Sequence, residues 1–229
     1  MPDWTAPQRP NSYVEQSLVS AILDGTFPVG SSLPGERALS TQLGVTRPTL
    51  REAIQRLARD GWLTVRQGKP TLVNNYWREG GLNVLSALVQ YSQQLPPDFV
   101  PNLLEVRLQL APAYTRAAVV QAPDEALACL NGYEALADTA VAFAHFDWEL
   151  HHCLTIASGN PIYTLILNGF AGFYEELAQL YFARPQARQT SRQFYAALAT
   201  AVTQQDAALA EQITREAMAL SLALWRDFQ

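Results

Sequence analysis

Two groups of residues in this sequence have types and spacings that suggest chemistry, and the first is a pair of arginines. Arg47 and Arg51 stand four residues apart in the run VTRPTLREAIQRLARDG, so they share one face if that run is helical. Like charges at this spacing destabilise an isolated helix by roughly 0.2–0.5 kcal/mol. A guanidinium group matches both phosphate oxygens and the O6/N7 edge of guanine, so DNA is a partner that would account for the pair.

Arg56 and Arg59, further along the same run, have a simpler explanation. Glu52 and Asp60 each stand four residues from Arg56 and can pair with it. We therefore expect Arg56 and Arg59 to lie on a solvated face, whereas DNA is the favoured interpretation for the first pair.

The second group lies in the run FDWELHH. Asp147 and His151 are four residues apart and can share a metal ion on one helix face, or they can form an active site with His152. Both alternatives are disfavoured. The chain has three histidines and none after residue 152, and it lacks a GxSxG elbow, a P-loop and a GxGxxG fingerprint. We expect no metal, no cofactor and no enzymatic activity.

Charge is distributed unevenly along the chain. The net charge of −5 seems to argue against a nucleic-acid partner. However, residues 1–75 carry eight basic and six acidic residues, a balance of +2, while the remainder carries eight basic and fifteen acidic residues, a balance of −7. The positive charge is therefore local to the part of the chain that contains the arginine pair.

The elements that position these arginines are three helices and a β-hairpin. Apolar periodicity predicts helices over residues 11–25 and 36–44, the second with Ala38, Leu39 and Leu43 pointing inward. The third helix has Thr46 as its N-cap and ends before a glycine at position 61.

The hairpin follows directly after that glycine. Residues 62–66 and 71–73 have the pattern of two strands joined by the turn Arg66–Pro70. The run NNYWREGG that comes next has the composition of a linker.

After Leu82 the pattern is helical to the end of the chain, without period-two alternation. Prolines and glycines divide it into about seven helical segments, at 82–93, 98–120, 124–138, 139–157, 161–183, 186–203 and 206–227. The predicted fold is mainly α, with a DNA-binding domain over 1–75, a linker over 76–82 and an all-helical domain over 83–229.

The two cysteines, Cys129 and Cys153, lie in apolar helical patterns without CxxC spacing. This pattern favours buried free thiols over a disulfide or a metal pair. The sequence has no run of 18 apolar residues and no signal-like N-terminus, so a cytoplasmic location without membrane attachment is expected.

A short helix, a tight turn and a second helix with a polar N-terminus make a helix-turn-helix, whose second helix presents its first residues to base edges. The hairpin would be the wing of a winged helix. Its tip is formed by Gln67 and Gly68, and glycine there lets the backbone approach DNA closely.

The run LPGERALSTQLGVTRPTLREAIQRLARDGWLTVRQGKPTLV resembles the winged-helix domain of the GntR transcription factors, whose signature is LPxERxLS, GV[ST]R and LREAxxRLxx[DE]G. In two places the chain departs from the family, with Pro48 in place of threonine and Gln67 in place of histidine. The resemblance implies DNA contacts at Arg37, Thr46, Arg47, Thr49, Arg51, Gln67 and Gly68.

Further motifs, including NLLxVR, ASGNPIYxLILNG and YFAxPxAR, resemble the GntR-family regulators of fatty acid metabolism. That resemblance implies a homodimer on a palindromic operator, which represses fatty-acid degradation genes, activates unsaturated fatty-acid synthesis genes and is released by long-chain acyl-CoA. Met218 departs from the family's glycine. The implied acyl-CoA contacts are Leu103, Leu104, Arg107, Tyr174, Tyr181, Ser221 and Trp225.

Two alternative functions remain beside this one. Some related GntR regulators hold a metal with an aspartate, the histidine four residues on, and two later histidines. The two later positions fall near Tyr195 and Ser221 in this chain, which disfavours a metal-associated organic acid as the effector. An acyl-CoA-processing enzyme is the least favoured alternative.

Overall fold

The computed structural model describes residues 10–92 and 94–227. The chain forms two compact units, residues 1–95 and 96–229, and each is described by itself below. Residues 1–9, 93 and 228–229 fall within the predicted domain boundaries but lie outside the described residues.

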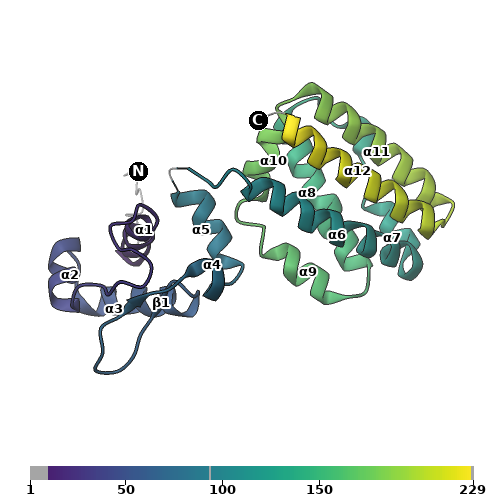
Figure 1. Ribbon diagram of the computed structural model, residues 1–229. Coiled ribbons are helices and arrows are strands. Elements are labelled where there is room, and N and C mark those ends of the chain that lie inside the picture. Colours follow the sequence, from purple (N-terminus) through teal and green to yellow (C-terminus); the bar gives the residue numbers. More distant parts are fainter. Residues whose placement is uncertain (1–9, 93, 228–229) are drawn as a thin grey trace, which may run out of the picture. The chain divides into compact units, whose positions relative to one another are not determined.

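The first unit contains the three predicted helices and the hairpin (Figure 1). Its two strands are antiparallel, with Leu63 opposite Val73, and Ser32 adds an isolated bridge to Leu72. The elements are α1 (Pro10–Leu23), α2 (Glu36–Leu43), α3 (Arg47–Arg59), β1 (Leu63–Thr64) and β2 (Leu72–Val73).

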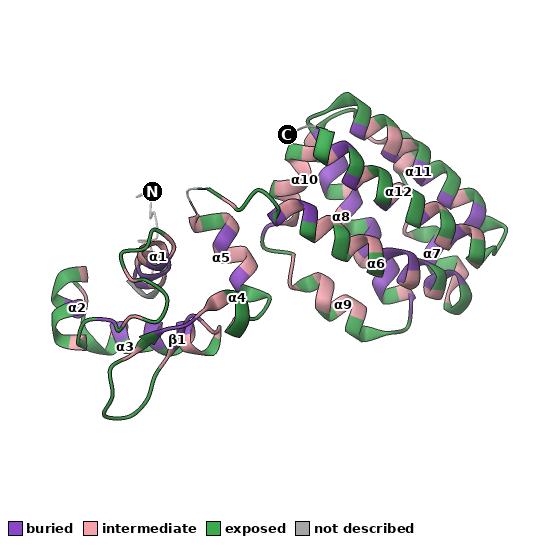
Figure 2. Ribbon diagram, viewed as in Figure 1, coloured by how far each residue is buried: buried purple, intermediate pink, exposed green. Residues whose placement is uncertain are grey.

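Helices α1, α2 and α3 each bury one apolar face (Figure 2). The buried residues include Val14, Leu18, Ile22, Leu39, Leu50, Ala53, Ile54, Leu57 and Trp62. Burial of one such aliphatic side chain contributes about 1.5–3 kcal/mol, so this small core can hold the unit together. The expectation that Ala38 points inward was wrong. The short helix α2 turns Leu39 and Ser40 to the core and leaves Ala38 exposed.

The predicted linker over 76–82 is partly helical, and the division between the units comes later than expected. Helix α4 (Tyr76–Glu79) begins within it, and α5 (Asn83–Tyr91) packs on α1 with Val84 and Leu88 buried. Two glycines make the packing close. A Cβ on Gly61 would lie 2.5 Å from the Glu79 carbonyl oxygen, and one on Gly80 would lie 2.5 Å from Val84. The division therefore falls after Leu95, because α5 belongs to the first unit.

The second unit is all-α, as predicted. Its elements are α6 (Phe99–Gln121), α7 (Pro123–Ala128), the 3-10 helix η1 (Tyr133–Ala135), α8 (Ala140–Ala157), α9 (Pro161–Asn168), α10 (Tyr174–Phe182), α11 (Pro185–Thr203) and α12 (Ala207–Asp227).

Two predicted helical segments are broken in the structure. The segment 124–138 is interrupted at Gly132, whose φ of 88° is left-handed and favours glycine. The segment 161–183 becomes α9 and α10, because the chain leaves the helix for a turn over residues 169–173. Both halves of each segment are apolar, so periodicity alone does not reveal the breaks.

The core of the second unit lies where α6, α8, α10, α11 and α12 meet. Helix α6 packs along α12 and against α8, while α10 packs on α8 and α11 packs on α12. Phe143, Phe182 and Tyr195 are among its largest fully buried side chains. Buried residues line the facing sides of these helices in Figure 2. None of the helices in the described residues is long and apolar enough to cross a membrane.

Cys129 and Cys153 form a disulfide, so the prediction of two free thiols was wrong. Cys129 follows the last turn of α7 and Cys153 lies on α8, which packs against α7 and brings the two Cα atoms to 5.7 Å. The pair is 24 residues apart in the sequence, and only the tertiary packing of α7 on α8 brings the sulfur atoms together.

We predict that replacing both cysteines by serine lowers the free energy of unfolding by about 3 kcal/mol. A cross-link that closes a loop of this length restricts the unfolded chain by about that amount. Urea unfolding of the oxidised protein, the reduced protein and the double variant would test this. The reduced protein should match the variant, and an oxidised protein no more stable than the variant would contradict the prediction.

Candidate functional site

The N-terminus of α3 is an exposed polar surface built by a tight turn. Gly44 ends α2 in the left-handed conformation, with φ of 67°, and lets the chain turn into the next helix. Thr46 then caps α3, because its side-chain oxygen accepts a hydrogen bond from the Thr49 backbone N–H at 3.3 Å. Pro48 occupies the first turn, as the sequence predicts. The first turn of α3 is thus fixed in conformation by its cap.

The two arginines of this surface differ in their surroundings. Arg47 is exposed, whereas Arg51 Nε lies 2.7 Å from Glu36 Oε2 at the start of α2. Sequence reasoning missed Glu36 as a partner, because the pair spans fifteen positions. The Arg51 side chain is 63% exposed. Exposed ion pairs contribute little net free energy, so Arg51 can exchange Glu36 for a phosphate at small cost.

Arg56 and Arg59 lie on a face with carboxylates, as expected, but with one difference. Arg56 pairs with Glu52 at 2.6 Å and also with Glu15 of α1 at 3.2 Å. Asp60 does not pair with Arg56. It lies 3.4 Å from Arg59 Nε, and it accepts a hydrogen bond from Asn83 on α5.

The remaining predicted DNA contacts lie on α2 and on the hairpin. Arg37 is exposed on α2, and Gln67 and Gly68 are exposed in the loop between β1 and β2. Gly68 has φ of 71°, a left-handed conformation that favours glycine. The loop projects away from the helices of the unit (Figure 1). All seven predicted contacts therefore belong to one unit, on three neighbouring elements.

A cavity opens among α6, α9, α10 and α12 of the second unit. It encloses about 900 Å³ of space, part of which is open to solvent. All seven residues that the resemblance assigns to an acyl-CoA site lie on its lining, namely Leu103, Leu104, Arg107, Tyr174, Tyr181, Ser221 and Trp225. Their role in binding is a prediction, but their gathering around one space is a structural fact.

Sequence reasoning missed the contribution of α9 to this cavity. Tyr163, Ile166 and Leu167 line it, together with Phe170 and Phe173 of the turn that follows. Helix α9 is strongly apolar, yet none of its residues is fully buried in the core. An apolar helix without core residues is the signal that could have revealed a cavity wall.

A cluster of buried polar groups lies behind the cavity wall. Asp147 of α8 accepts hydrogen bonds from Arg107 Nη2 at 2.6 Å, from the Tyr174 hydroxyl at 2.5 Å and from the Tyr195 hydroxyl at 3.1 Å. The Arg107 guanidinium also lies 5.6 Å from the centre of the Tyr174 ring. This one carboxylate joins residues of four helices.

The electrostatics of the cluster keep the central pair charged. Burial alone would raise the pKa of Asp147, but Arg107, then His151 and the hydrogen-bond donors outweigh it and lower that pKa. For Arg107, burial opposes the charge, yet Asp147 raises the pKa above its ordinary value. Burial and the nearby guanidinium lower the pKa of His151 to about 3, so its imidazole is neutral. The Tyr114 hydroxyl lies 2.7 Å from its Nδ1.

The arrangement of these groups does not resemble a metal site. His151 Nε2 lies 3.7 Å from Asp147 Oδ1, and the other carboxylate oxygen, Oδ2, pairs with the Arg107 guanidinium at 2.6 Å. Tyr195 donates to Asp147, and Ser221 pairs with Tyr181 instead. Among residues 10–92 and 94–227, no group of three or more His, Cys, Asp or Glu side chains is placed to hold a metal ion.

Two buried N–H groups on the cavity lining have no partner within the described part of the chain. They are Arg107 Nε and Trp225 Nε1. A buried donor without an acceptor costs free energy, so such groups indicate a ligand or water that supplies one. The otherwise apolar lining therefore includes two residues that carry a donor without an acceptor.

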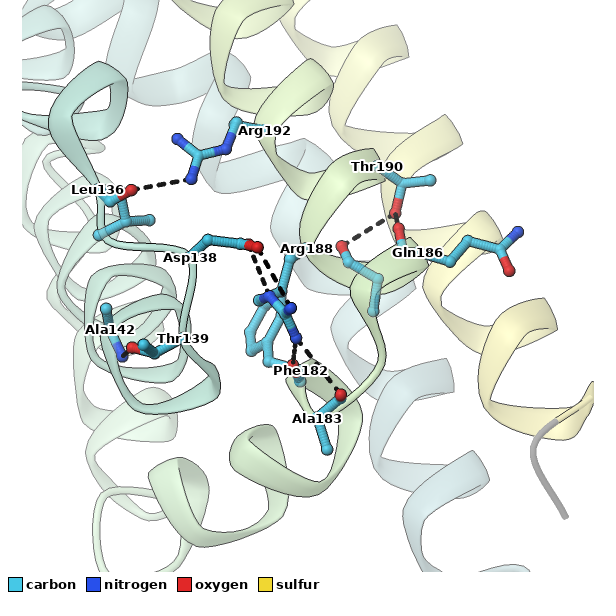
Figure 3. A network of polar contacts seen from close by, with 11 residues as sticks. Leu136, Asp138, Thr139, Ala142, Phe182, Ala183, Gln186, Arg188, Thr190 and Arg192 are labelled. Atoms are coloured by element: carbon cyan, nitrogen blue, oxygen red, sulfur yellow. Dashed lines mark hydrogen bonds and ion pairs between the residues drawn. The ribbon is translucent and has the colours of Figure 1, made fainter.

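Arg188 fixes the end of the cavity helix α10 (Figure 3). Its Nη1 donates to the Phe182 carbonyl at 2.7 Å and to the Ala183 carbonyl at 3.3 Å, where the helix ends without backbone partners. Its Nε donates to Asp138, just before α8, at 2.7 Å. These bonds fix the last turn of α10, which carries Tyr181 of the cavity lining.

Arg192, one helical turn further along α11, also binds the segment between η1 and α8 (Figure 3). Its Nη2 donates to the Leu136 carbonyl at 2.8 Å, and its guanidinium lies 5.0 Å from the centre of the Phe143 ring. The segment between η1 and α8 is thus bound to α11 at two points.

The two units match two known protein families. Residues 10–73 match the bacterial regulatory proteins of the gntR family, and residues 74–229 match the FadR C-terminal domain. The fold and the exposed N-terminus of α3 thus belong to a GntR-type, DNA-binding transcription regulator. The second match covers more than half of the chain, and the chain belongs to the FadR family of these regulators.

Relatives and solved structures agree with this family. The chain is 47% identical over 186 residues to a fatty acid metabolism regulator protein of Shewanella halifaxensis, covering 81% of this chain and 78% of that protein. It is 47% identical over 192 residues to the protein of that name from Klebsiella pneumoniae, covering 84% and 80%. The solved structure of Lar from Listeria monocytogenes covers 98% of this chain and 100% of its own, with a TM-score of 0.65 and 15% identity, and so shows a shared fold.

We predict that Thr46→Ala lowers the free energy of unfolding of the full chain by about 1 kcal/mol, because α3 loses its capping acceptor. Thr46→Ser keeps the oxygen and should match the unchanged protein. Urea unfolding followed by circular dichroism measures both variants. Equal stability of the alanine and serine variants would show that the cap contributes nothing.

Proposed function

We propose that this protein is a homodimeric, cytoplasmic regulator of fatty acid metabolism that long-chain acyl-CoA releases from a palindromic operator. In this proposal it represses genes of fatty-acid degradation and activates genes of unsaturated fatty-acid synthesis. The class of regulator and the names of its relatives support the subject of regulation. The effector is argued from the cavity.

The observation that carries the proposal is the composition of the cavity wall. Apolar and aromatic side chains from four helices surround a space large enough for part of an acyl chain. Arg107 and Trp225 of the lining each carry a buried N–H group without a partner, and a carbonyl or another acceptor near the head of the chain would supply one. A long apolar chain with a polar, acceptor-rich end fits both features.

The DNA side of the proposal follows from the exposed start of α3. A helix-turn-helix reads base edges with the first residues of its second helix, and a symmetric dimer reads two such half-sites. The exposed Arg47 suits a guanine edge or a phosphate, and the loop that ends in Gly68 suits the neighbouring minor groove.

Release of DNA requires that the effector distinguish two states of the protein. An acyl-CoA that bound the DNA-competent and DNA-incompetent forms equally would shift nothing. By reciprocity, operator DNA must then weaken acyl-CoA binding by the same factor. For two separate sites this factor has a finite limit, whereas direct competition for one site excludes the second ligand completely.

The proposal predicts the outcome of a fluorescence-anisotropy titration with a palindromic operator at fixed salt. Myristoyl-CoA should release the operator, whereas a metal chelator should not. Salt is held constant because phosphate contacts make affinity depend steeply on it. The released mixture should contain no free CoA above background, since we expect no thioesterase activity. Release by the chelator, with indifference to myristoyl-CoA, would instead favour a metal-associated organic acid as the effector.

We predict that Arg47→Ala weakens operator binding by about 1–3 kcal/mol and reduces the preference for operator over unrelated DNA. Arg59→Ala, which changes an exposed arginine of the same helix beside Asp60, serves as the matched control and should bind nearly as the unchanged protein does. An equal loss on operator and unrelated DNA would make Arg47 a phosphate contact rather than a base contact.

A further inference from the structure

One charged residue meets the cavity among the described residues that line it, and its charge is already neutralised. Arg107 is that residue. Asp147 is not on the cavity lining, but it lies directly behind, and its Oδ2 accepts from Arg107 Nη2 at 2.6 Å. The side chain of Asp147 is 4% exposed and that of Arg107 is 20% exposed. The wall of the cavity therefore contains a neutral ion pair rather than an unpaired cation.

The carboxylate is held in place by more than the arginine. The hydroxyls of Tyr174 and Tyr195 donate to its two oxygens, from α10 and α11. Oδ2 accepts from Arg107 and Tyr174 and Oδ1 accepts from Tyr195, so Asp147 cannot turn away from Arg107 without breaking the bonds to both tyrosines. The neutralisation is thus a fixed feature of the site.

This arrangement has different consequences for a charged and an uncharged acyl head. A fatty-acid carboxylate that enters loses its hydration, and an uncompensated buried charge is costly. Arg107 could donate its Nε–H to that carboxylate, but its single positive charge is already balanced by Asp147, and the two carboxylates would repel each other at close range. A thioester carbonyl needs no counter-charge, and the free N–H groups Arg107 Nε and Trp225 Nε1 can satisfy it.

We propose that Asp147 is a specificity residue, which makes the cavity select uncharged acyl esters and thioesters and reject free fatty acids. This inference rests on the proposed function, because it concerns the ligand of the same cavity. Asp147 acts here without touching the ligand, by removing the charge that would attract a carboxylate.

Two single variants give the neutral site a net charge, which is positive in one variant and negative in the other. Asp147→Asn leaves the Arg107 cation unpaired, so the cavity should bind myristate about 10–100-fold more tightly than the unchanged protein does, as a charge-assisted hydrogen bond provides. Arg107→Gln leaves the carboxylate unpaired, so the cavity should gain binding of tetradecylamine and still reject myristate. The second variant keeps the test valid if the first does not fold.

Two controls separate charge from local damage. Tyr195→Phe removes one hydrogen bond to Asp147 but keeps its charge, so it should not gain myristate binding. The double variant with Arg107→Gln and Asp147→Asn is neutral again and should gain neither myristate nor tetradecylamine. Circular dichroism and melting temperature report whether each variant is folded.

The experiment is calorimetric titration of the full chain and its variants with methyl myristate, myristate and tetradecylamine, below the concentrations at which they aggregate, together with ligand-induced shifts in melting temperature. Binding of methyl myristate by the unchanged protein tests whether the cavity takes acyl chains at all, and its absence would contradict the proposed function. Binding of myristate as tight as that of the ester would overturn the role of Asp147 alone. A folded Asp147→Asn variant that binds the ester but gains no myristate would overturn it as well.

Discussion

The ion pair between Arg107 and Asp147 is the interaction on which the second unit depends. Arg107 Nη2 of α6 lies 2.6 Å from Asp147 Oδ2 of α8. Tyr174 of α10 and Tyr195 of α11 donate to the same carboxylate. Removing two charges from water is expensive, and a buried pair stabilises a fold less than apolar residues of the same volume often do. Its presence beside a cavity is therefore better explained by the properties it gives that cavity than by stability.

The pair also constrains what the surrounding residues can be. A second acid near Asp147 would leave a net negative charge, and a charged His151 would add a positive one. Burial and the guanidinium keep His151 neutral, so the cluster stays balanced. The hydroxyl of Tyr114 pairs with Nδ1 of the imidazole, and Arg188 fixes the end of α10. Among the described residues, the buried side-chain atoms of this unit without a hydrogen-bond partner are Arg107 Nε and Trp225 Nε1 of the cavity lining, together with Thr115 Oγ1 and His151 Nε2.

Local sequence signals predicted the first unit well, because its architecture depends on local signals. The cap at Thr46, the left-handed Gly44 and the apolar stripe of α3 each act within one or two helical turns. The docking of α5 was missed, because it packs on α1, which is distant in the sequence, and because Gly61 lets the end of α4 approach across eighteen positions.

In the second unit, the important contacts join residues that are distant in the sequence. Periodicity predicted its helical character and the resemblance pointed to seven residues of the cavity lining, but neither found the partner of Asp147. The local spacing suggested His151, four residues away, whereas the strongest partner, Arg107, is forty residues earlier. The disulfide between Cys129 and Cys153 was missed for the same reason, since only the packing of α7 on α8 brings these residues together.

Communication between the two units is limited by where the chain changes from one to the other. Because α5 packs on α1 and buries Val84 and Leu88, it moves with the DNA-binding unit rather than with the ligand unit. The chain passes to the second unit after Leu95, at Pro96-Pro97. Proline fixes φ at both positions, which restricts the backbone where the second unit begins. A ligand of the second unit can influence the unit that carries α3 only if it binds two states of the protein with different affinity.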